Sequence, residues 1–193
     1  MAISLLGISG SARRESLNRK LLGAACKQIR SQGADVTELD MRDFELPLYD
    51  GDIEDNEGFP QKVLELKEIF KRHDGFIIAS PEYNSSISPL LKNLIDWVSR
   101  PAQGEAALEC FAGKTAALLS ASPGGLGGLR GLVTVRSILG NIKVLVLPDQ
   151  FALSSAGSAF DEKGNLKDST HVQAVERVIS ALVNVTGALR ASR

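Results

Sequence analysis

Hydroxyl, glycine and arginine residues crowd into one short segment, residues 9–18, which reads Ser-Gly-Ser-Ala-Arg-Arg-Glu-Ser-Leu-Asn. An apolar run at residues 3–8 precedes it, and a helical pattern follows. A strand, a glycine- and hydroxyl-rich loop and a helix start together favour phosphate binding, because backbone N–H groups converge there and the helix N-terminus is partially positive. We therefore predict a phosphate site whose side-chain donors are Ser11, Arg13, Ser16 and Asn18. The alternative is that Ser16 only caps the helix and Arg13 is solvated.

The elements that position this segment alternate between strand and helix periods. Apolar runs predict strands at residues 3–8, 75–80, 114–121 and 143–147, and a short second strand is predicted at residues 36–40. Amphipathic stripes predict helices at residues 17–32, 59–73, 88–98, 126–139 and 170–189. Strands that are apolar on both sides and separated by helices predict an α/β fold with a parallel sheet covered on both faces. We expect one domain over residues 1–193, doubly wound in the order 2-1-3-4-5.

The 42–58 segment does not fit this alternation. It contains Pro47, two glycines and an acidic run of five carboxylates within residues 50–57, so we interpret it as a solvated surface loop.

In a doubly wound sheet the ligand crevice opens at the carboxyl ends of the first and third strands. The third strand is followed by Pro81, Glu82, Tyr83 and Asn84, and the fourth by Ser122, Pro123, Gly124 and Gly125. Backbone groups of the first set suit the polar edge of a flat ring that Tyr83 partly covers, although Glu82 and Asn84 also suit a plain turn. The paired glycines let a third backbone approach closely. A monophosphate joined to a flat ring describes FMN.

Composition limits the other classes of function. The net charge is −1, so we expect no general attraction to nucleic acid or to an anionic membrane. The uninterrupted apolar runs are strand-sized, and the first residues lack a signal-peptide pattern, which leads us to expect a cytoplasmic protein.

His73 and His171 are isolated, so we predict no metal site. Cys26 is expected to be buried in a helix, whereas the exposure and reactivity of Cys110 stay open.

Residues 10–18, together with the segment at 81–97 that begins Pro-Glu-Tyr-Asn and ends Ile-Asp-Trp, resemble the NAD(P)H-dependent FMN reductase family. This is the flavodoxin-like group that includes chromate, quinone and azo-dye reductases. The resemblance continues more loosely through residues 122–125 and 160–166. It places the family's phosphate loop on Ser11, Arg13, Ser16 and Asn18, its ring loop on residues 81–84 and its third loop on residues 122–125.

The resemblance implies an oxidoreductase in which FMN carries the chemistry, NADPH or NADH is the co-substrate, and no dedicated catalytic side chain is needed. It implies ping-pong turnover with quinone, chromate, azo, ferric or flavin acceptors, and a homodimer or homotetramer. Asn93, Asp96 and Trp97 match within a helix, and we interpret them as structural. Ser85 stands where several relatives carry a larger or basic residue, so the choice between NADH and NADPH stays open. The alternatives are a flavodoxin-like electron carrier and a flavin-binding redox sensor.

Overall fold

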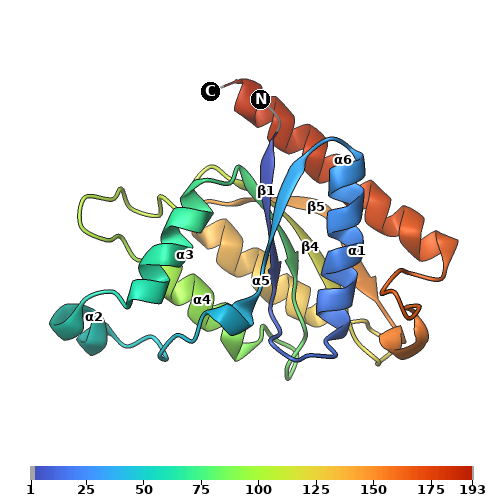
Figure 1. Ribbon diagram of the computed structural model, residues 1–193, viewed down its shortest axis with the longest axis horizontal. Helices are drawn as coiled ribbons and strands as arrows, with labels where there is room; N and C mark the ends of the chain where they lie inside the picture. Colours follow the sequence, from blue (N-terminus) through green and yellow to red (C-terminus); the bar gives the residue numbers. More distant parts are fainter. Residues whose placement is uncertain (1–2, 193) are drawn as a thin grey trace.

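The computed structural model describes residues 3–192 and contains one five-stranded parallel sheet (Figure 1). Its spatial order is β2-β1-β3-β4-β5, as predicted. The strands are β1 Ser4–Ser9, β2 Asp35–Leu39, β3 Gly75–Ala79, β4 Thr115–Ala121 and β5 Leu145–Leu153. Leu5 pairs with Gly75, and Gly75 with Thr115, so the carboxyl ends of the three central strands lie together at one edge.

Helices cover both faces of the sheet (Figure 1). On one face lie α1 (Leu17–Ser31) and α6 (Ser169–Ala191), and on the other α3 (Gln61–Lys71), α4 (Pro89–Ser99) and α5 (Leu129–Asn141). Successive strand side chains point to opposite faces, so Leu5 belongs to the core under α1 and Leu6 to the core under α3 and α4. This two-sided burial explains the uninterrupted apolar strands.

The prediction of a loop over residues 42–58 is wrong in part. A short helix, α2 (Gly51–Glu57), lies within it, and a 3₁₀ turn (Met41–Asp43) precedes it. Asp50 caps α2 by accepting from the Asp52 N–H at 2.9 Å, and Gly58 ends it with φ +76°. The acidic residues that suggested a solvated loop are also favourable in the first turn of a helix.

Two other elements differ from their predicted bounds by three residues or more at one end. The helix expected from residue 126 begins at Leu129, because Gly127 and Gly128 have φ values of +62° and +90°. The last strand, expected at 143–147, runs from Leu145 to Leu153, past an irregularity in its pairing with β4. The sequence predicted a shorter strand because Pro148 and Asp149 are residue types that seldom occur inside a strand.

Among the described residues, α6 is the one helix with the length and apolarity of a membrane span, with a mean hydropathy of 1.2. Its apolar residues Val175, Ile179 and Leu182 are fully buried against the sheet and α1. Packing in the core therefore accounts for the apolar stripe of α6 that faces the sheet.

A buried ion pair lies between α3 and the connection at residues 100–114. The Lys67 ammonium, 2% exposed, lies 2.8 Å from the Glu105 carboxylate, which also contacts Lys71 at 3.0 Å. Burial raises the pKa of Glu105, but hydrogen bonds from Lys67, the Ala102 N–H and Lys71 outweigh burial and lower this pKa to about 2. The pair ties the 100–114 connection to α3.

This cluster predicts an acid-sensitive contribution to stability. Because the pKa of Glu105 is lowered in the folded state, its contribution is complete above the ordinary value of 4.5 and is lost as the pH falls through about 2. We expect a loss of roughly 3 kcal/mol from this group over that interval. Urea unfolding of the parent and Glu105→Gln as a function of pH measures it. A stability difference between the two that does not change with pH contradicts the assignment.

Candidate flavin site

A cavity of about 360 Å³ lies at the carboxyl ends of β1, β3 and β4. All three predicted loops line it, which confirms that the switch point gathers them. Nine of the twelve predicted site residues line this cavity: Ser11, Arg13, Ser16, Asn18, Pro81, Glu82, Tyr83, Ser122 and Pro123. Asn84, Gly124 and Gly125 do not. The sequence did not single out Glu15, Leu17 and Ala121, which also contribute to the wall.

The first loop presents donors to this cavity. Ser16 caps α1 by accepting from the Arg19 N–H at 3.2 Å, which leaves its own O–H proton available. Ser11 is buried and lines the cavity, while Arg13 is exposed. The Arg13 side chain forms no ion pair with the part of the chain that the structure describes. A guanidinium, two hydroxyls and the first N–H groups of α1 are the donors that a phosphate requires.

The structure shows a role for Asn18 besides the predicted phosphate contact. Its side-chain amide donates to the Ala121 carbonyl at 2.9 Å and accepts from the Ala121 N–H at 3.0 Å. The residue is 4% exposed. This pair of bonds joins the start of α1 to the end of β4, and so fixes the first loop against the third. One amide N–H remains, which keeps phosphate contact by Asn18 a prediction.

The ring loop closes through a tight turn. Tyr83 and Ser86 exchange both backbone hydrogen bonds at 3.0 Å, and Asn84 and Ser85 between them have φ values of +51° and +63°. These angles are those of a two-residue type I′ turn, in which asparagine is favoured. The turn places Asn84 at an exposed tip, whereas Tyr83, 46% exposed, lines the cavity.

Glu82 holds the ring loop to α5, a contact that the sequence did not reveal. Its carboxylate accepts from the Gly131 N–H at 3.0 Å and from Arg130 at 2.7 and 2.9 Å. Since α5 has no side-chain cap of its own, Glu82 satisfies one of its first N–H groups. Burial raises the pKa of Glu82, but the bonds from Gly131 and Arg130 prevail and lower it, which keeps the carboxylate charged.

The glycines of the third loop divide into two kinds. A Cβ on Gly128 would lie 1.9 Å from the Ser120 hydroxyl, and one on Gly127 would lie 2.7 Å from backbone atoms. Packing therefore requires these two glycines. Gly124 and Gly125, the predicted pair, meet no such obstacle, so a role in ligand approach stays a prediction for them.

Two of the three α4 residues that we interpreted as structural, Asn93 and Trp97, hold the loop at 46–49 in place. Asn93 donates to the Pro47 carbonyl at 2.9 Å and accepts from the Tyr49 N–H at 2.8 Å, while the Trp97 indole donates to Pro47 at 2.8 Å. Asp96 instead pairs with Lys92 on the surface of α4. None of the three lines the three-loop cavity.

Neither cysteine is available for chemistry in the folded protein. Cys26 is fully buried, as predicted, and Cys110 is 1% exposed because the 100–114 connection, to which it belongs, packs it against α3. Burial raises the pKa of the Cys26 thiol to about 12 and also raises that of Cys110. No group of three or more potential metal ligands occurs within residues 3–192.

We expect the native protein to resist thiol reagents. Both sulfurs are buried and protonated at neutral pH, so a colorimetric disulfide reagent should react with neither until a denaturant is added. Two thiols should then react per chain. Rapid reaction of one thiol in the native state contradicts the burial of Cys110.

The doubly wound sheet, the phosphate-type loop and the two further loops at the switch point define a flavodoxin-like protein built to hold a flavin mononucleotide. The model of the NADPH-dependent FMN reductase family matches residues 3–158, and the chain therefore belongs to that family. It is an oxidoreductase with FMN as cofactor and NAD(P)H as co-substrate.

Individual relatives agree with this assignment. The chain is 39% identical over 171 residues to a probable NADPH:quinone oxidoreductase from Oryza sativa, covering 86% of this chain and 80% of that one. It is 36% identical over 181 residues to an NAD(P)H-dependent FMN reductase from Pseudomonas aeruginosa, covering 93% of each. The solved structure of FerB, an NAD(P)H:(acceptor) oxidoreductase from Paracoccus denitrificans, is 26% identical with a TM-score of 0.84, covering 97% of this chain and 98% of that one.

Proposed function

We propose that this protein is an FMN-dependent NAD(P)H oxidoreductase that reduces quinone-type acceptors. The observation that carries the proposal is the three-loop cavity, where donors for a phosphate face a ring loop across the switch point. When bound, FMN accepts electrons from NAD(P)H and passes them on. The protein binds the cofactor, orients its ring and leaves one face accessible.

Each part of the cavity has its own task in this mechanism. Arg13 would neutralise the phosphate of FMN, and Ser11 and Ser16 would donate hydrogen bonds to it. The ring loop, fixed by the bonds from Glu82 to α5, presents backbone groups to the edge of the ring, where N–H donors stabilise charge that develops on reduction. Glu82 is fully engaged by Arg130 and Gly131, so its role is positioning rather than proton transfer.

An adjoining apolar cavity supports the choice of acceptor class. It measures about 500 Å³, shares Ser11, Arg13 and Tyr83 with the three-loop cavity, and extends along Pro89 and Leu90 at the start of α4. An apolar wall beside an aromatic side chain favours a flat, weakly polar acceptor. Relatives named quinone reductases support the same choice. Chromate, azo dyes, ferric chelates and free flavin are further candidates, since an accessible flavin face is not selective.

We also propose ping-pong turnover, in which reductant and acceptor would occupy one accessible face of the bound flavin in turn. Rapid mixing with NADPH without oxygen tests the proposal: the visible flavin absorption should bleach in one fast phase and recover when a quinone is added. Parallel lines in double-reciprocal plots at several quinone concentrations are expected for ping-pong turnover. No bleaching would favour the flavodoxin-like carrier or the redox sensor instead.

We also propose a homo-oligomer in the cytoplasm. Leu129 and Val133 on the first turns of α5, and Leu126 in the loop before it, are exposed apolar side chains, and a second copy of the chain is the proposed partner that covers them. Light scattering on the parent and Val133→Glu tests this, and a parent that is an active monomer would contradict it.

The cysteines support the proposed location, because both are free thiols, as is typical of reducing compartments. Microscopy of a fluorescent fusion tests the location.

A further inference from the structure

The wall of the three-loop cavity contains charges of both signs. In the part of the chain that the structure describes, it presents one guanidinium, Arg13, and two carboxylates, Glu15 and Glu82. The phosphate of FMN is close to doubly charged at neutral pH, so each carboxylate opposes its binding unless a cation balances that carboxylate. The Lys20 ammonium lies 2.9 Å from the Glu15 carboxylate. The Arg130 guanidinium lies 2.7 Å from the Glu82 carboxylate.

The two ion pairs differ in their contact with water. The Glu15 side chain is 81% exposed, whereas the Glu82 side chain is 10% exposed. Water therefore screens the charge of Glu15, but the charge of Glu82 acts through a medium of lower dielectric constant. A negative charge on a flavin ring in this cavity therefore interacts more strongly with Glu82 than with Glu15.

The start of α5 is shaped to receive the Glu82 carboxylate. Its Oε1 atom accepts from Nε and Nη2 of Arg130 at 2.9 and 2.7 Å, and its Oε2 atom accepts from the Gly131 N–H at 3.0 Å. A Cβ on Gly131 would lie 3.2 Å from the Glu82 Cβ, so the glycine leaves room for this side chain. The Arg130 side chain is 59% exposed, and its replacement therefore removes a charge without opening the core.

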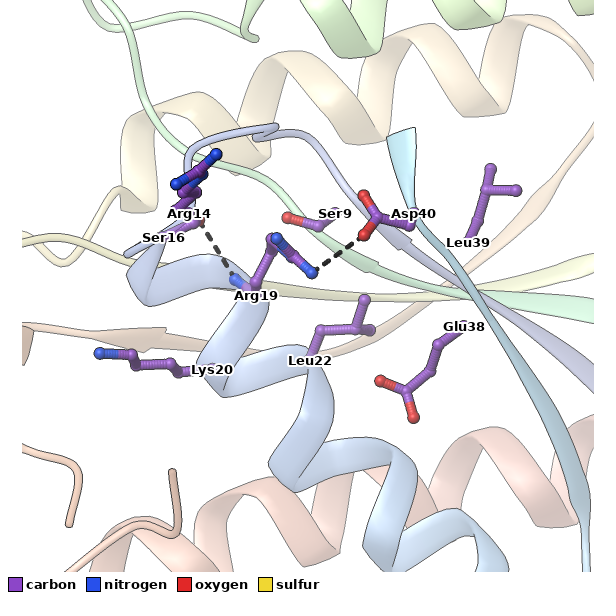
Figure 2. Close-up of a pocket in the computed structure, with 9 residues that line it drawn as sticks. All are labelled: Ser9, Arg14, Ser16, Arg19, Lys20, Leu22, Glu38, Leu39 and Asp40. Atoms are coloured by element: carbon purple, nitrogen blue, oxygen red, sulfur yellow. Dashed lines mark hydrogen bonds and ion pairs between the residues drawn. The ribbon is translucent and has the colours of Figure 1, made fainter. Parts of the chain in front are cut away.

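A second charged cavity provides a comparison pair. It measures about 410 Å³ and lies between α1 and the end of β2, on the other side of the phosphate loop (Figure 2). Figure 2 shows the Arg19 guanidinium directed at Asp40, and this ion pair measures 3.1 Å. Ser16 lines both cavities, whereas neither member of the pair lines the three-loop cavity. The Arg19–Asp40 pair thus has the same chemistry as the Glu82–Arg130 pair but lies outside the candidate flavin site.

We propose that Arg130, by balancing the buried charge of Glu82, sets the reduction potential of the FMN bound in the three-loop cavity. The proposal rests on the proposed function, which places FMN there. Transfer of a hydride, equivalent to two electrons and one proton, converts NAD(P)H to NAD(P)⁺ and adds one negative charge to the ring. An unbalanced carboxylate on the wall opposes this added charge, and Arg130 removes the opposition. Arg130 acts through Glu82 and is therefore a positioning residue.

The midpoint potential of the bound FMN, measured at pH 8 by equilibration with a reference dye, tests this without turnover. In Arg130→Met, the dissociation constant of reduced FMN relative to that of oxidised FMN should rise about tenfold, which lowers the potential of a two-electron couple by about 30 mV. Glu82→Gln removes the carboxylate charge and should raise the potential by a similar amount. The double variant Glu82→Gln/Arg130→Met contains neither charge, so its potential should return close to that of the parent.

Two control variants separate charge balance from loop support. Arg19→Met removes the cation of the comparison pair and should keep the parent potential. Arg130→Lys retains the positive charge and should also keep it. If the Glu82–Arg130 pair only held the ring loop in place, both single variants would shift the potential in the same direction, and the double variant at least as far. That pattern, or unchanged potentials in both single variants, overturns the proposal.

FMN affinity distinguishes a failure of this proposal from a failure of the proposed site. Weakened FMN binding in Arg13→Ala with an unchanged potential in Arg130→Met refutes the charge balance alone. Parent-like FMN affinity in Arg13→Ala together with unchanged potentials refutes the proposed site as well. Opposite shifts in the two single variants support the proposal whatever the affinity of Arg13→Ala. If Arg130→Met does not retain FMN, a raised potential in Glu82→Gln supports the proposal, and an unshifted or lowered one overturns it.

Discussion

Replacing Arg13 and Ser16 together by alanine is expected to raise the dissociation constant of FMN by about two to four orders of magnitude. In the proposed site each side chain would supply a charge-assisted hydrogen bond to the phosphate, worth roughly 1.5–3 kcal/mol, and about 1.4 kcal/mol corresponds to a factor of ten. The loss is large because the Arg13 guanidinium is the cation on the wall of this cavity. Fluorescence titration of the flavin-free protein with FMN measures the change.

The control for this variant separates phosphate binding from helix capping. Ser16 also caps α1, so its removal costs about 1 kcal/mol of stability by itself. Asp168→Ala removes the equivalent cap from α6, far from the cavity in sequence, and should lower stability without changing FMN affinity. The single variant Arg13→Ala keeps the cap and should still weaken binding by about tenfold or more. Parent-like affinity in both Arg13 variants would place the phosphate elsewhere.

Asn18→Ala is expected to lower the free energy of unfolding by about 2–5 kcal/mol. The substitution leaves the N–H and the carbonyl of Ala121 without their partners in a buried site, at roughly 1–3 kcal/mol each. It also releases the first loop from the third, so FMN affinity should fall with stability. Urea unfolding measures the first effect. Asn184→Ala, at an exposed position of α6, is the matched control and should be near neutral.

Asn18→Asp gives this prediction a pH signature. A charged aspartate places an acceptor against the Ala121 carbonyl, whereas the protonated form donates to it. The folded state therefore raises the pKa of the new carboxyl, and the stability of the variant should be highest in acid and fall as the pH rises through that pKa. A variant whose stability relative to the parent does not depend on pH would show that the Asn18 bond to the Ala121 carbonyl contributes little.

Local patterns in the sequence were sufficient for the main elements and for the edge that holds the site. Apolar runs and helical stripes predicted the five strands and their order, because a parallel sheet needs strands buried on both faces. They were insufficient where two local signals competed. The acidic residues at 50–57 predicted a loop, but this segment forms α2 and its cap. Pro148 predicted the end of the last strand, but β5 continues to Leu153.

Local sequence patterns could not predict contacts between segments that lie far apart in the sequence. Asn18 was read as a phosphate donor because it lies in the phosphate loop, yet its amide bonds Ala121, which lies 103 positions further along the chain. Glu82 was read as a ring-loop residue, but its carboxylate serves the N-terminus of α5 through Gly131. The burial of Cys110 likewise depends on how the 100–114 connection folds over α3.

By itself, then, the sequence determined the fold class, the edge of the sheet where a phosphate and a flat ring are held, and the resemblance to a family. Each of these depends on residue types and spacings within one short segment, or on the order of such segments. Only the tertiary structure decided which donors face the cavity, which polar groups instead join the loops, and that a second charged cavity lies between α1 and β2. The physical reason is that side-chain partners are set by which strands and helices pack together, and this packing brings together residues that no local pattern relates.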